Sequence, residues 1–117
     1  MVEGDIFNTL KGLVANRCYP DVAPSGAVKP YMVYQQVGGE APTFLERAQP
    51  SKKNGRFQVA VWSTTRAEAA NIALQAEAAM VAATAFDAKP VGAPIAVYDD
   101  ETQLRGSLQD FTVWSDR

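Results

Sequence analysis

The residues that could do chemistry in this chain are few, because its 117 residues include no histidine and a single cysteine, Cys18. Without histidine, the commonest general base and the commonest metal ligand are missing, and a Ser-His-Asp triad is impossible. A single cysteine forms neither an internal disulfide nor a cysteine-based zinc cluster, so we expect Cys18 to pack as a small apolar side chain. The sequence therefore favours a protein that is not an enzyme and carries no cofactor.

Three consecutive acids, Asp99, Asp100 and Glu101, are the clearest candidate ligands for a hard cation. Consecutive carboxylates in a turn point in alternate directions and rarely converge on one ion, so a solvated turn is the simpler interpretation. Gly38-Gly39 lacks the following Lys-Ser/Thr pair of a phosphate-binding loop. We expect neither a metal site nor a nucleotide site.

The bulk properties of the chain indicate one globular domain, residues 1–117. Hydrophobic residues make up 47% and charged residues 21%, which is ordinary for such a domain. With 11 basic against 13 acidic residues, the chain lacks the broad basic field that attracts nucleic acid, so no sequence-specific nucleic-acid partner is expected. The first ten residues resemble no signal peptide, and no stretch approaches the roughly 20 apolar residues that span a bilayer. We expect the protein to have no membrane partner and to be made and used in a reducing cytoplasm.

Two hydrophobic periods predict an α+β fold. Apolar residues at helical spacing between Ile6 and Val14 predict a first helix, and a capping box at Thr65-Arg66-Ala67-Glu68 predicts the start of a second, which runs to about Ala83. Alternating patterns predict four strands, at Tyr31–Val37, Arg56–Ser63, Ile95–Tyr98 and Leu104–Trp114. The expected architecture is a four-stranded antiparallel sheet with two helices, in the order α-β-β-α-β-β.

The spacing of apolar residues in the last strand is irregular. Leu108 and Phe111 are three residues apart, whereas Phe111 and Val113 are two apart, so a regular strand cannot place all three side chains on one face. A β-bulge near Gln109-Asp110 would reconcile them, and we predict one there.

Alternation along the strands also predicts which side chains share each face of the sheet. The core face is expected to hold Tyr31, Val33, Val37, Phe57, Val59, Val61, Phe111 and Val113. The opposite face is expected to hold Met32, Tyr34, Trp62 and Trp114, and aromatic residues and Met are enriched in protein contacts. Two interpretations stay open: chain ends or loops cover this face within the monomer, or Tyr34, Trp62 and Trp114 contact a neighbouring subunit or partner.

The connection from Glu40 to Gly55 is long for a hairpin, so we expect it to be mobile in a free subunit and ordered by a neighbour.

Charge is also uneven along the chain. The segment from Arg47 to Arg66 contains five basic residues and no acidic one, namely Arg47, Lys52, Lys53, Arg56 and Arg66, whereas Phe86 to Asp116 contains six acids. Such asymmetry would help a head-to-tail ring to close, and ordinary scatter of surface charge explains it nearly as well.

Several segments together resemble the tail-completion, or tail-terminator, family of siphophages and related prophages. They are Arg17–Pro24, Pro30–Val37, Phe57–Ser63 with the alanine-rich helix after it, Tyr98–Leu104 and Asp110–Trp114. The resemblance covers nearly the whole chain in order, and its motifs are structural. This chain departs from the family pattern between Leu108 and Phe111, where the usual two-residue spacing has become three.

The resemblance implies a structural protein that forms a ring, commonly of six subunits, in the virion tail or neck. Its implied partners are further copies of itself, the tail tube protein and the head connector or neck protein, with genome DNA passing through the ring. In that setting the acids Asp99, Asp100 and Glu101 would face either the channel or a neighbour's basic segment around Lys52, Lys53 and Arg56. A second class of function also stays open, a small monomeric adaptor or regulatory domain encoded by a phage.

Overall fold

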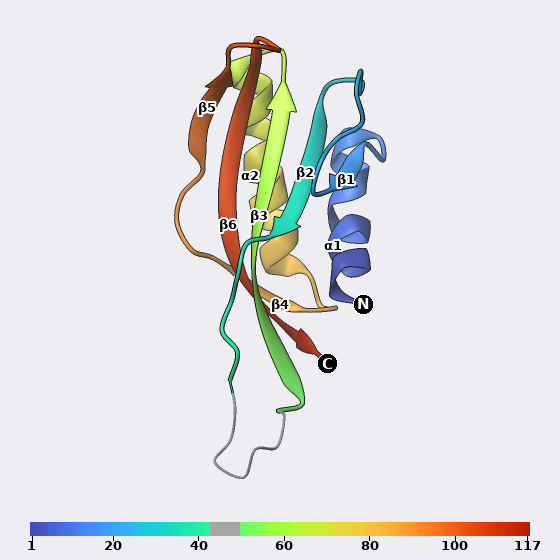
Figure 1. The fold of residues 1–117 in the computed structure, drawn as a ribbon, viewed down its shortest axis with the longest axis vertical. Helices are drawn as coiled ribbons and strands as arrows, with labels where there is room; N and C mark the ends of the chain where they lie inside the picture. The colour runs from blue at the N-terminus through green and yellow to red at the C-terminus, as the bar shows by residue number, and fades with distance from the viewer. Residues whose placement is uncertain (43–49) are drawn as a thin grey trace.

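The computed structural model describes residues 1–42 and 50–117. One twisted sheet forms the body, elongated along its strands, and both helices lie on the same face of it (Figure 1). In chain order the elements are α1 (Val2–Leu10), the short 3-10 helix η1 (Lys11–Val14), β1 (Cys18–Pro20), β2 (Tyr31–Gln36), β3 (Lys52–Ser63), α2 (Arg66–Ala82), β4 (Asp87–Pro90), β5 (Ile95–Asp99) and β6 (Leu104–Asp116).

The sheet is larger than the sequence predicts. All four predicted strands are present as β2, β3, β5 and β6, but β1 and β4 bring the total to six, in the order β1-β2-β3-β6-β4 with β5 also beside β6. Strand β6 lies between β3 on one side and both β4 and β5 on the other. The pairing is antiparallel except between β1 and β2, which are parallel. The prediction of a four-stranded, wholly antiparallel sheet is therefore wrong in number and in that one pairing.

Both additional strands are short and end in proline, which is why their sequences predict connectors. Strand β1 is held by hydrogen bonds from Met32 N to Arg17 O and from Asp21 N to Tyr34 O. Strand β4 includes Pro90 at a sheet edge, where a missing N–H group does not interrupt the ladder of the inner strands. Tertiary pairing thus orders segments whose local sequence signals a break.

The two predicted helices are present, and the capping of α2 differs in detail from the predicted box. The Thr65 hydroxyl accepts a hydrogen bond from Glu68 N at 3.2 Å, as expected of an N-cap. The Glu68 carboxylate instead accepts from the Ser63 hydroxyl, whose oxygen accepts from Thr65 N. The last residue of β3 therefore joins the cap and fixes the direction in which α2 leaves the sheet.

The predicted β-bulge in the last strand is absent. Strands β3 and β6 pair without a break from Lys52 opposite Asp116 to Ser63 opposite Arg105. The three-residue spacing is resolved because Leu108 lies on the opposite face of the sheet from Phe111. Strand β3 also begins at Lys52, four residues before the predicted Arg56, so Lys52–Gly55 belongs to the ladder and not to a loop tip.

The predicted faces of β2 are inverted. Met32 and Tyr34 pair with Val61 and Val59 and face the helices, whereas Tyr31 and Val33 lie on the outer face. Neither face of β2 is polar enough to decide the matter locally. The core decides it, because Met32, 0% exposed, packs in one cluster with Ile6 and Leu10 of α1.

The core lies between the inner face of the sheet and the two helices. Its largest fully buried side chains are Phe57, Phe111, Ile6, Leu10, Met32 and Met80. Cys18 belongs to the same cluster, as expected of a small apolar side chain. The described helices include none with the length and apolarity needed to cross a lipid bilayer.

Candidate protein-contact surfaces

Two consecutive rows of side chains cross four strands on the sheet face turned away from the helices. The pairing register joins the first row as Tyr31, Trp62, Gly106 and Val97, and the second as Val33, Ala60, Leu108 and Ile95. We call these eight residues the apolar rows. Five of them line a depression of about 400 Å³, namely Tyr31, Val33, Ala60, Trp62 and Leu108, and its other lining residues are Asp21–Ala23, Gln35, Gln58 and Asp99. The outer face of an antiparallel sheet is commonly polar, so apolar rows there indicate a contact surface.

Trp62, predicted from the sequence as a contact residue, lies in the first apolar row. A Cβ added to Gly106 would approach within 2.6 Å of Trp62 Cζ3 and 2.8 Å of Val97 Cγ2. Only glycine at position 106 therefore allows the indole ring to lie this close to β6. The ring is half-buried in the monomer, so it stiffens the surface as well as contributing to it.

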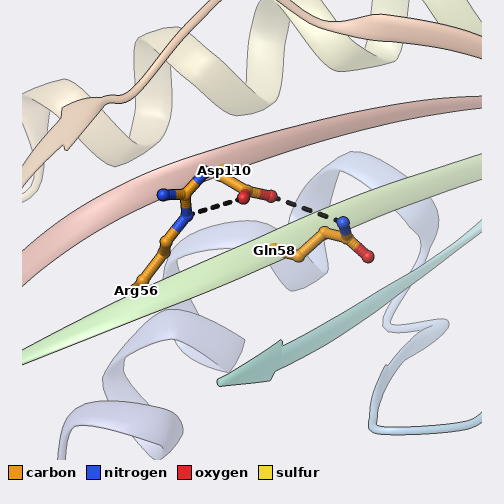
Figure 2. A network of polar contacts seen from close by, with 3 residues as sticks. All are labelled: Arg56, Gln58 and Asp110. Carbon is orange, nitrogen blue, oxygen red and sulfur yellow. Dashed lines mark hydrogen bonds and ion pairs between the residues drawn. The ribbon is translucent and has the colours of Figure 1, made fainter. Parts of the chain in front are cut away.

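A polar row of Arg56, Gln58 and Asp110 borders the second apolar row, because Gln58 and Asp110 are the next outward-facing pair along β3 and β6. Figure 2 shows these three side chains. Arg56 Nε donates a hydrogen bond to Asp110 Oδ2 at 2.8 Å, and Gln58 Nε2 donates to Asp110 Oδ1 at 3.4 Å. The side chains of Arg56 and Asp110 are 48% and 22% exposed, so their ion pair contributes about 0.2–1 kcal/mol to stability. The charge of Arg56, a predicted contact residue, is thus balanced within its own chain.

The remaining predicted basic residues are spread over both faces. Lys52 forms an ion pair with Asp116 at 2.5 Å, and this hydrogen bond and the lysine charge lower the pKa of Asp116. Lys53, next along β3, points to the other face and is half-buried. Arg47 lies outside the described residues. Among the described residues, the predicted basic side chains are therefore divided between the two faces, with Lys52 and Arg56 on one and Lys53 on the other.

The other two aromatic residues predicted as contacts, Tyr34 and Trp114, do not lie beside Trp62. Tyr34 is in the core, 5% exposed, and its burial, followed by the nearby Cys18, Glu3 and Asp21, raises its pKa. Trp114 lies on the outer face near the far end of β6, where with Lys52 and Asp87 it lines a second depression of about 670 Å³. Of the three aromatics, Trp62 and Trp114 are available at the surface, at separate places.

The three acids of the β5–β6 turn have unequal roles. Asp99 is half-buried and accepts hydrogen bonds from Glu101 N at 3.1 Å and from Thr102 Oγ1 at 2.9 Å, so it shapes the turn. Asp100 and Glu101 are exposed. Residues 1–42 and 50–117 contain no cluster of three His, Cys, Asp or Glu side chains placed to bind a metal ion.

A second apolar surface, which the sequence analysis did not identify, lies on α2. Its inward side packs on the sheet through Ala69, Ile72, Ala73, Ala76 and Met80. Its outward side carries Ala67, Ala70, Leu74, Ala78 and Val81, all exposed; we call these five residues the outer stripe. Leu74 and Val81 are 61% and 54% exposed. Alanine on both sides hides the stripe from a periodicity argument, because the helix has no sharply polar face.

Comparison with known proteins identifies the family of this chain. A search of curated proteins found no match. A scan of protein-family models matched residues 7–116 to the family described as Tail completion protein gp17. The matched residues run from α1 to the end of β6 and contain both apolar surfaces. The chain therefore belongs to the Tail completion protein gp17 family and has a role in bacteriophage tail assembly.

Proposed function

We propose that this protein is a structural subunit that assembles as a ring, ends the growing tail tube and joins the tail to the head connector. The observation that carries the proposal is the family match over residues 7–116, which includes every strand of the sheet. Two apolar surfaces on one small domain support it, one exposed on α2 and one partly exposed on the sheet, since a ring subunit meets a neighbour on each side. A ring of six is the expected size.

The proposed partners are further copies of the chain, the tail tube protein and a connector or neck protein. The proposed role requires neither catalysis nor a cofactor, and the lack of histidine in the sequence agrees with this. Assembly takes place in the host cytoplasm, after which the protein stays in the tail or neck of the virion.

Within such a ring, we place Asp100 and Glu101 toward the channel. Lys52 and Arg56 already have acidic partners in their own chain, which weakens the alternative of ion pairs with a neighbour's acidic turn. Carboxylates repeated around a ring repel phosphate over the screening length of about 8 Å and discourage DNA from binding to the wall.

A reconstitution experiment tests the function. Tails and filled heads are isolated from cells in which the gene for this chain is deleted, and purified protein is added back before infectious particles are counted. The proposal predicts that heads and tails mixed without the protein stay separate, and that adding the protein joins them. A monomeric adaptor would leave joining unchanged, and that result would reject the proposal.

A further inference from the structure

The two apolar surfaces lie on opposite sides of the same subunit. The outer stripe is on the side of α2 turned away from the sheet, and the apolar rows are on the sheet face turned away from α2. Figure 1 shows α2 running behind β3 and β6, so the helix and the rows are back to back across the sheet. A subunit of this kind presents a helix surface on one side and a sheet surface on the other.

The chemistry of the two surfaces matches. The outer stripe consists of alanine, leucine and valine, and the apolar rows contain no charged side chain. A contact between the two surfaces would therefore not remove water from any charged group of either surface. Each surface offers apolar area whose burial is favourable. The exposed polar residues Glu68, Asn71 and Gln75 of α2 lie beside the outer stripe, where they would stay in water at the rim of such a contact.

The subunit itself shows which partner suits the helix. On its inward side, α2 packs against this sheet through alanines with a few larger residues, Ile72 and Met80, between them. The outward side repeats that composition, with Leu74 and Val81 among alanines. Small side chains let a helix approach a sheet closely, and the depression over the second row offers space for a larger one.

We propose that the outer stripe of α2 in one subunit packs on the apolar rows of the next copy of the chain. The contact is heterologous, because it uses a different surface on each side, so it repeats from copy to copy and closes when the rotation permits. The polar row of Arg56, Gln58 and Asp110 then borders the interface as part of its rim. This inference rests on the proposed ring and names the surfaces that form it.

Cross-linking by engineered cysteines tests the contact. Leu74→Cys places a thiol on the outer stripe and Ile95→Cys places one on the apolar rows, at side chains that are 61% and 63% exposed. The native Cys18 is buried, 3% exposed, and stays unmodified. A short bis-maleimide is added at high protein concentration to each variant alone, to an equimolar mixture, and to the double variant.

The heterologous contact predicts little product from either single variant, covalent dimers that go no further in the mixture, and a ladder of larger species from the double variant. The control is Val28→Cys, 64% exposed in the connector between β1 and β2, which should give only background when mixed with Leu74→Cys. Dimers from Leu74→Cys alone or from Ile95→Cys alone indicate a symmetric contact and overturn the proposal. Background levels in both the mixture and the double variant overturn it as well.

Repeating the reaction on reconstituted tails separates this inference from the proposed function. Tails that join heads but give no ladder reject the contact and keep the function. A ladder from a protein that fails to join heads and tails rejects the function and keeps the contact.

Discussion

Two single residues show how closely side chains pack on the outer and inner faces of the sheet. Gly106 makes room for the Trp62 ring on the outer face, and Cys18 fills part of the core under β1. Gly106 has no side chain and the thiol of Cys18 is buried, so both residues have structural roles. Each role predicts a measurable effect on stability.

Gly106→Ala should destabilise the fold, although alanine is usually the better residue in regular structure. The new methyl group would lie 2.6 Å from the Trp62 ring, so the ring or β5 must shift, at a cost of about 1–3 kcal/mol. Gly4→Ala is the matched control, since its Cβ meets nothing within 4 Å and alanine in α1 should stabilise by about 0.5–1 kcal/mol. Urea unfolding measures both, and equal effects of the two substitutions would contradict the packing described for Trp62.

Cys18 should make the protein sensitive to alkaline pH. Burial raises the pKa of its thiol from 9.0 to about 11, so above pH 9 the unfolded chain ionises while the folded chain does not. Stability is fully present below pH 9 and falls as pH rises toward 11, by at most about 2.7 kcal/mol from this group. Denaturant unfolding at pH 8 and pH 10.5 should show a smaller loss for Cys18→Ala than for the unchanged protein. An equal loss in both would place the alkaline effect elsewhere.

At the scale of the elements, the junction between β3 and α2 sets the helix on the sheet. Thr65 caps the helix, and Ser63 ties the carboxylate of Glu68 to the end of the strand. The outer stripe depends on this junction, since the cap fixes the start of α2 and hence the rotation at which its residues face outward.

Thr65→Ala should therefore cost about 1 kcal/mol, within the usual range of 0.5–2 kcal/mol for a lost N-cap. Thr64→Ala, at the exposed neighbouring threonine, is the control and should change stability by less than about 0.5 kcal/mol. Thermal unfolding followed by far-ultraviolet circular dichroism distinguishes the two. A larger effect at Thr64 would show that the cap is assigned to the wrong residue.

The elements also show how far the sequence alone could predict this fold. Long or strongly marked elements were predictable: α2 from its capping box, and β3, β5 and β6 from alternation. The face of β2 was not, because Tyr31, Met32, Val33 and Tyr34 are all large and the choice depends on packing against α1.

The contact surfaces were predictable only in part, for a related reason. Trp62 was identified by residue type, but the apolar rows exist only once the register aligns β2, β3, β6 and β5. The outer stripe carries no sequence signal, since its alanines match those on the buried side. A surface that forms by pairing across strands, or that is marked only by a lack of polar residues, can be identified only from the three-dimensional structure.

The whole subunit has an acidic turn at one end of the sheet, and Figure 1 shows the start of β3 at the other. Replacing the exposed acids, as Asp100→Asn with Glu101→Gln, should leave rings and head joining intact and slow DNA passage through the channel. Asp99 is kept because its side chain shapes the turn. Single-particle DNA ejection assays measure the rate.

The control for the acidic turn is Glu40→Gln with Asp87→Asn, a pair of exposed acids elsewhere in the chain. This pair should eject DNA at the unchanged rate. Normal ejection and full infectivity in the turn variant would mean that Asp100 and Glu101 form an ordinary solvated turn. Loss of rings would instead support a contact between the turn and a neighbouring subunit.

If this chain forms the ring that completes a phage tail, electron microscopy should show that ring on purified tails. Tails are purified from cells that lack the gene for this chain and imaged before and after the purified protein is added. We expect bare tube ends before addition and a ring of density on one end of each tube afterwards, with averaged images showing repeated copies of this fold. Tube ends that stay bare while the protein remains monomeric in solution would contradict it.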